Sequence, residues 1–147
     1  MKIIGYLSSR LSNIILMGFS ITCLSQAAAS AELTVNVSGL KQGQGHLMVA
    51  LYTDAASYKS NTASQYAKVK VAGEQELVVF EALASGDYAI KMYQDENDNN
   101  KFDYNITGFI PKEAYGFSNN KGRFGEPSYE KSRFTVDGDT SISITLF

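Results

Sequence analysis

Apolar and polar residues alternate through most of the chain after residue 31. Leu33, Val35 and Val37 alternate with polar neighbours, which is the period of two expected for a strand with one buried face. Residues 46–53 are apolar on both faces, which indicates a central strand. The predicted strands span residues 33–38, 46–53, 66–72, 75–83, 88–94, 129–136 and 142–146.

The segments between these strands contain residues typical of turns and loops. Residues 39–45 are rich in glycine, and Asp137-Gly138 is a dipeptide favoured in tight hairpin turns. Residues 54–65 break the alternation, and Asp54 is suited to cap one helical turn there. Seven short strands without a long helix predict an all-β, antiparallel two-layer β-sandwich of immunoglobulin or transthyretin-like type.

The first 31 residues have the features of a secretory signal peptide. Lys2 and Arg10 make the start basic, a mostly apolar stretch follows, and a run of small residues precedes Glu32. We therefore expect cleavage after Ala31 and one exported domain, periplasmic or extracellular, over residues 32–147. The apolar stretch is shorter than the roughly 20 residues that a membrane span needs, so no transmembrane segment is expected after cleavage.

The charge and the cysteine content exclude some classes of partner and a disulfide in the domain. The chain has 15 acidic and 13 basic residues, and removal of the leader takes away Lys2 and Arg10 but no acidic residue. An acidic domain argues against nucleic acid and anionic membrane surfaces as partners, and suits a cation ligand. The single cysteine, Cys23, lies in the leader, so the domain has no disulfide; a lipid anchor on Cys23 stays open as an alternative.

The strongest candidate site follows the strand at 88–94. Side-chain oxygens recur at Asp95, Asn97 and Asn99, and another carboxylate follows at Asp103. Lys101 falls where calcium loops supply a backbone carbonyl, and calcium prefers six to eight such oxygen ligands. The spacing therefore predicts a calcium-type cation site, with Ca²⁺ as the expected ion.

This loop differs from an EF-hand at two positions and in its flanking strands. Asn100 replaces the expected glycine, although asparagine tolerates the left-handed conformation, and Ile106 cannot supply the final bidentate carboxylate. Glu113 is the candidate for this missing ligand. The alternative interpretation is an Asn/Asp-rich turn whose side chains bond only to their own backbone.

A second group of candidate residues lies in the long segment after this loop, where no regular period appears. Aromatic rings mixed with amide and hydroxyl groups are typical of surfaces that contact sugars or peptides. The alternative is that these rings anchor the loop as local core. The candidate ligand surface comprises Tyr115, Phe117, Ser118, Asn119, Asn120 and Phe124.

Several short motifs are spread along the second half of the chain: Gly86–Ile90, Asp95–Asn97, Asp103, Pro111–Glu113, Tyr115–Asn120 and Gly125–Pro127. With these motifs the chain resembles a bacterial exported family catalogued as domain of unknown function 2141. The resemblance implies an exported β-sandwich and no mechanism. Gln94 stands where the family often has histidine, which argues against a transition-metal or catalytic role for the loop.

Three functions are compatible with these patterns. The first is a non-catalytic binding or accessory module for a glycan or a protein of the cell envelope. The second is a carboxylate-based hydrolase of glycans, which would need a carboxyl group such as that of Glu113 facing a cleft. The third is a purely structural envelope protein. His46, the single histidine, has no partner for a zinc site or a nucleophilic pair and is expected to be structural or solvent-facing.

Overall fold

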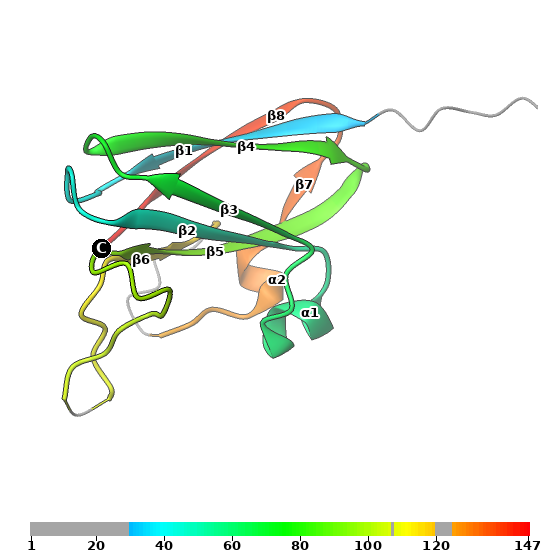
Figure 1. The fold of residues 1–147 in the computed structure, drawn as a ribbon. Coiled ribbons are helices and arrows are strands. Elements are labelled where there is room, and N and C mark those ends of the chain that lie inside the picture. Colours follow the sequence, from blue (N-terminus) through cyan, green and yellow to red (C-terminus); the bar gives the residue numbers. More distant parts are fainter. Residues whose placement is uncertain (1–29, 107, 120–124) are drawn as a thin grey trace, which may run out of the picture.

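The computed structural model describes residues 30–106, 108–119 and 125–147, and these residues form a sandwich of two sheets (Figure 1). One sheet has the order β4-β1-β8, and the other has the order β3-β2-β5-β6 with β7 paired to β5. The predicted all-β sandwich is confirmed. The strands are β1 (Ala31–Ser38), β2 (His46–Tyr52), β3 (Gln65–Lys70), β4 (Gln75–Leu83), β5 (Gly86–Asp95), β6 (Tyr115–Phe117), β7 (Phe134–Val136) and β8 (Thr140–Thr145).

One strand pair departs from the predicted antiparallel pattern. β1 and β8 run parallel, with Leu33 opposite Thr140 and Ser38 opposite Thr145. Parallel neighbours need a long connection, and these two strands are separated by nearly the whole domain. The alternation of residues locates strands but does not show which distant strands become neighbours.

The core lies between the sheets and follows the predicted alternation. The side chains of Leu33, Val35 and Val37 in β1 are buried, and those of Leu47 and Val49 in β2 face them. β1 already begins at Ala31, which is buried and pairs with Leu83 of β4. Residues 1–29 of the predicted leader, including Cys23, lie outside the described residues.

Two segments differ from the predicted elements. Residues 129–136 form α2 (Tyr129–Ser132) followed by β7, because the Tyr129 hydroxyl turns inward to the carbonyls of Thr53 (2.9 Å) and Asp87 (3.0 Å). The long loop contains β6, a short strand that the sequence pattern did not predict.

The predicted helical turn is confirmed as α1 (Ala55–Ser60). The Asp54 carboxylate accepts the N–H groups of Ala56 and Ser57, both at 2.8 Å, and the bond from Ser57 is the main cause that lowers the pKa of Asp54. No helix among the described residues has the length and apolar character needed to cross a membrane.

Candidate functional site

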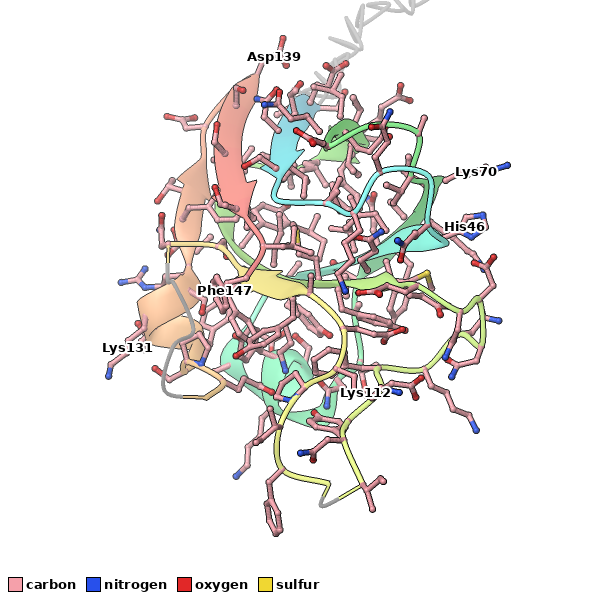
Figure 2. The ribbon with its side chains drawn as sticks, turned by 90° about the vertical axis from the view of Figure 1, so that its left-hand side faces the viewer. His46, Lys70, Lys112, Lys131, Asp139 and Phe147 are labelled. Carbon is pink, nitrogen blue, oxygen red and sulfur yellow. The ribbon has the colours of Figure 1, made fainter. Side chains whose placement is uncertain are left out.

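The candidate loop and the two helices lie on the same side of the sandwich. Figure 1 shows the segment between β5 and β6 projecting from one end of the β3-β2-β5-β6 sheet, while α1 and α2 lie at the other end. Figure 2 views the end of the molecule that carries the loop, with His46 at one edge and Lys112 on the projecting segment. The outer face of this sheet is therefore bounded at both ends, and that face holds the candidate site.

The predicted donor residues of the loop bond to one another and to the loop backbone. Asp95 Oδ1 and Asn97 Oδ1 both accept the N–H of Asn99, each at 3.1 Å. The side-chain amides of Asn97 and Asn99 both donate to Asp103 Oδ2, at 2.7 and 3.0 Å. The N–H of Lys101 donates to Asn99 Oδ1 at 2.8 Å. These side chains thus converge on one turn, in which Asp95 is buried while Asn97 and Asn99 stay exposed.

Alternate residues of the same loop point outward and contact the sandwich. Asn100 has the left-handed conformation that its position was predicted to require, with φ of 58°. His46 has the structural role expected for it, as one of these contacts. The three outward pairs are Lys41 with Glu96 (2.6 Å), His46 with Asp98, and Lys68 with Asn100 (2.7 Å).

Glu113 binds both ends of the loop. Its Oε1 accepts the N–H of Glu96 and its Oε2 accepts the N–H of Asp103, each at 2.9 Å. The side chain is 5% exposed. Each oxygen keeps a second lone pair. The two bonds that are present connect the ends of the loop through one side chain and so fix the distance between them; we call this arrangement the Glu113 clamp.

Asp95 and Glu113 are buried carboxylates that have no basic partner among the described residues. Asp95 is 0% exposed, and its carboxylate accepts the N–H groups of Asn99 and Asn100. Within the described part of the chain, no lysine, arginine or histidine forms an ion pair with either residue. Buried charges usually have a paired charge or a metal ion.

The donor set of the loop combines carboxylates with amides. No group of three or more His, Cys, Asp or Glu side chains that could hold a metal ion occurs among the described residues. The coordination shell of a cation in this loop would therefore need the carboxylates of Asp95 and Asp103, the amide oxygens of Asn97 and Asn99, and a backbone carbonyl. Hard cations such as calcium accept this mixture of ligands, whereas zinc prefers nitrogen and sulfur.

Gln94 and Gly45 fix the base of the loop against the turn between β1 and β2. Gln94 is fully buried; it accepts the N–H of Lys41 (2.8 Å) and donates to the carbonyls of Lys41 and Gln44. Gly45 has φ of 54°, and a Cβ there would lie 1.8 Å from the carbonyl oxygen of Asp95. Only glycine fits this close approach of two backbones.

Beside the loop, the outer face of the β3-β2-β5-β6 sheet forms a groove of about 960 Å³. Two rows of side chains cross its floor, each with one residue from every strand of the sheet. Ala50 is the small residue between two large ones, which deepens the floor. The rows are Lys68, Met48, Tyr93 and Tyr115, and Tyr66, Ala50, Lys91 and Phe117.

The wall of the groove continues directly from the candidate cation loop. Phe102, the residue before Asp103, packs its ring against Tyr93 (5.3 Å between centroids), Tyr104 (4.9 Å) and Tyr115 (5.6 Å). Burial is the main cause that raises the pKa of Tyr93, and the nearby carboxylate of Asp95 adds to it. The conformation of the loop therefore determines where this aromatic wall lies.

The opposite side of the groove is built around Lys91. Its ammonium lies 4.0 Å from the ring centroid of Tyr58 and 5.2 Å from that of Tyr52. It also pairs with Glu126 at 2.5 Å and donates to Asn61 Oδ1 at 2.6 Å. The charge of Lys91 is thus largely compensated inside the groove.

The predicted ligand surface is assembled only in part. Tyr115 and Phe117 line the groove and are half-buried. Ser118 is buried, and its hydroxyl joins the N–H of Ile90 to the carbonyl of Ser132, so its role is in the fold. Asn119 is exposed and donates to the carbonyl of Arg133 at 2.6 Å. The predicted residues Asn120 and Phe124 lie outside the described residues.

Other groove residues were missed by the sequence analysis, although a signal for some was present. Tyr66 and Tyr93 occupy the outward positions of their strands, in phase with Lys68 and Lys91. Outward aromatic residues on two strands would have indicated this face. Phe102 and Tyr104 lie in loops, where no period shows the direction of a side chain.

The fold and the site define a class: a two-sheet β-sandwich with an oxygen-rich loop and an aromatic groove on one outer face. The chain belongs to the family described as an uncharacterized protein conserved in bacteria, DUF2141, which matches residues 35–144. The resemblance seen in the sequence is thereby confirmed. Searches of curated proteins and of solved structures found no match.

Proposed function

We propose that this protein is an exported, non-catalytic binding module of the bacterial cell envelope. Its loop 95–103 would hold a calcium-type cation, and the groove beside the loop would hold the ligand. The observation that carries this proposal is the connection between them: the loop that gathers the oxygen donors also supplies Phe102 to the groove wall.

The charge distribution supports the cation. The carboxylates of Asp95 and Glu113 are buried and accept neutral N–H groups, while the basic side chains that contact the loop bond to its outward residues. A divalent cation on the inner side would offset the buried charge and use the remaining lone pairs of the loop oxygens. Export is supported by the leader-like first 31 residues.

The hydrolase alternative has less support. Both oxygens of Glu113 accept backbone N–H bonds, so this carboxyl group is not directed at a bound substrate. Glu126, the carboxylate among the described groove residues, is paired with Lys91. A glycosidase needs two carboxyl groups facing its substrate.

Calcium titration of thermal stability tests the cation site. Extracellular calcium modules have dissociation constants of about 10⁻⁴ to 10⁻³ M, so about 10 mM calcium should stabilise the domain by about 1.4 to 2.7 kcal/mol. We expect the Asp95→Asn and Asp103→Asn variants to lose this increase in Tm. Magnesium at the same concentration should have a smaller effect, because it demands a more regular shell.

The matched control is Glu81→Gln, which removes one acidic charge from an exposed position on β4. This variant should keep the full calcium response. A wild-type Tm independent of calcium would contradict the cation site, and so would an equal loss of response in the control.

A further inference from the structure

We propose that the groove binds an uncharged oligosaccharide, with sugar rings lying on the exposed faces of Tyr66 and Tyr104. This inference rests on the proposed function and names its class of ligand. Tyr66 is 69% exposed and Tyr104 is 48% exposed, and both line the groove. Flat apolar ring faces with hydroxyl groups at their rims suit a ligand whose own faces are apolar and whose rim is polar.

The groove is large enough for several linked sugar rings. Its floor spans four strands, or about 14 Å at the usual separation of neighbouring strands. Its volume of about 960 Å³ lies at the upper end of the range for small-molecule sites. One side of the groove is open because Tyr66 lies on the edge strand β3.

The polar groups of the groove include both donors and acceptors. The Asn61 carboxamide has both a donor and an acceptor, and the Tyr66 hydroxyl donates to the carbonyl of Asn61 (3.3 Å) and accepts the N–H of Ala63 (3.4 Å). Lys91 and Glu126 form a pair whose charges offset each other. A lipid chain would remove water from the Lys91–Glu126 ion pair, which costs free energy, and is disfavoured for that reason. Sugar hydroxyls also act as both donor and acceptor, and therefore match this lining.

A peptide added as an extra strand does not fit this site. The floor is the face of a paired sheet, in which the backbone groups of β2 and β5 already bond to neighbouring strands. A ligand on this face meets only side chains, so it must be recognised by ring faces and side-chain polar groups. Peptide binding by strand addition needs a free sheet edge, and in this sheet that edge is β3, at the border of the groove and not on its floor.

The charge balance favours a neutral sugar over an acidic one. Lys91 is paired with Glu126, and the ammonium of Lys68 donates to Asn100 of the candidate cation loop. Arginine, which gives the strongest bidentate contact to a carboxylate or phosphate, is absent from the described groove residues.

The test is binding of the calcium-loaded full domain to an array of neutral oligosaccharides, followed by titration of any hit. The chain has nine tyrosines and no tryptophan, so tyrosine fluorescence reports directly on the aromatic rings. Tyr66→Ala and Tyr104→Ala should each weaken binding about tenfold or more, because covering one aromatic ring contributes more than 1.4 kcal/mol. Their Tm values and calcium responses should stay close to wild type.

Leu77→Ala is the matched control, because Leu77 is 56% exposed on β4 in the other sheet. This variant should bind the oligosaccharide as tightly as the wild type. Absence of binding to every neutral glycan on the array would overturn the inference. A hit that tolerates both tyrosine variants, or a preference for palmitate or an extended peptide, would overturn it as well.

The outcome also separates this inference from the cation proposal. A calcium-dependent Tm without glycan binding would reject the ligand class and leave the cation site in place. Glycan binding with a Tm that ignores calcium would support the groove and reject the cation.

Discussion

The two outer faces of the sandwich are built by the same alternation of residues but differ in composition and cover. On the β4-β1-β8 sheet, small polar side chains bond to one another: Asn36 donates to Ser141 at 3.1 Å, and Ser38 bonds to Thr145 at 2.9 Å. The β3-β2-β5-β6 sheet instead carries the aromatic groove, with a loop at one end and helices at the other (Figure 1). Alternation alone therefore defines two layers, and the connections decide which of them carries a groove.

The difference has a physical cause in β5. This strand ends at Asp95, and the long segment that follows returns as β6 beside it in the same sheet. The segment therefore rises over the face on which Tyr93 and Lys91 lie. No described segment of comparable length covers the face with Asn36, so that face stays uncovered.

The largest expected effect comes from Gly45→Ala. The new Cβ would collide with the carbonyl of Asp95, and the left-handed φ of 54° adds strain, so we expect a loss of about 3 kcal/mol or more. Because the collision lies at the base of the loop, the groove wall should shift while the β4-β1-β8 face keeps its structure. Urea denaturation measures the loss, and amide chemical shifts locate it.

Gly43→Ala supplies the control for this variant. Gly43 lies in the same turn with φ of 72°, but a Cβ there meets nothing within 4 Å. It should cost only the strain of the backbone conformation, about 1 kcal/mol. If both variants lose the same stability, the close contact between Gly45 and Asp95 does not stabilise the position of the aromatic groove wall.

A smaller effect is expected for Glu113→Ala. The N–H groups of Glu96 and Asp103 lose a charged acceptor, while a buried charge disappears, so we expect a net loss of about 2 kcal/mol. Hydrogen exchange should accelerate at these two amides and stay unchanged at Val35 in β1. Glu113→Gln keeps one acceptor oxygen, so its exchange rates at these amides should lie between those of the wild type and Glu113→Ala. Unchanged exchange in the alanine variant would contradict the role of Glu113 as a clamp.

The two sheets illustrate how far the sequence predicts the fold. The alternation in β1 depends only on neighbouring residues, and it correctly separates buried from outward side chains. In β4 four apolar residues follow one another, and the structure exposes Leu77 and Val79 while it buries Val78 and Phe80. The parallel pairing of β1 with β8 depends on residues more than a hundred positions apart, and no local pattern encodes it. Residues 129–132 were wrongly predicted as strand because the inward turn of Tyr129 depends on contacts with Thr53 and Asp87.

In the candidate site, too, local features could be predicted from the sequence, whereas contacts between distant residues could not. The spacing of Asp95, Asn97, Asn99 and Asp103 is local, and the structure brings these side chains together as a short-range pattern predicts. The partners of the outward loop residues come from β2, β3 and the turn before β2, so they could not be inferred from the loop itself. The groove was missed because its floor needs the register of the whole sheet.

The smallest expected effect is a dependence of stability on pH at the end of the β3-β2-β5-β6 sheet where the helices lie. Burial raises the pKa of both Tyr52 and Tyr58 from 10.0 to about 12, and their rings pack edge to face at 5.2 Å. Since the folded pKa lies above the unfolded value, this contribution to stability is complete below pH 10 and is lost as the pH rises through about 12. The absorbance of phenolate should therefore show these tyrosines ionising late, together with unfolding.

Tyr58→Phe sharpens this test, because it removes one of the two phenols and its bond to Ser132 (3.2 Å). At neutral pH the variant should lose about 1 kcal/mol, the usual value of one hydrogen bond. Between pH 10 and about 12 its stability should fall less steeply than that of the wild type, since one fewer buried phenol must ionise. If stability falls equally steeply with pH in the wild type and the variant, the region around α1 and α2 unfolds locally before Tyr58 ionises. The helices would then be held to the sheet less firmly than the loop.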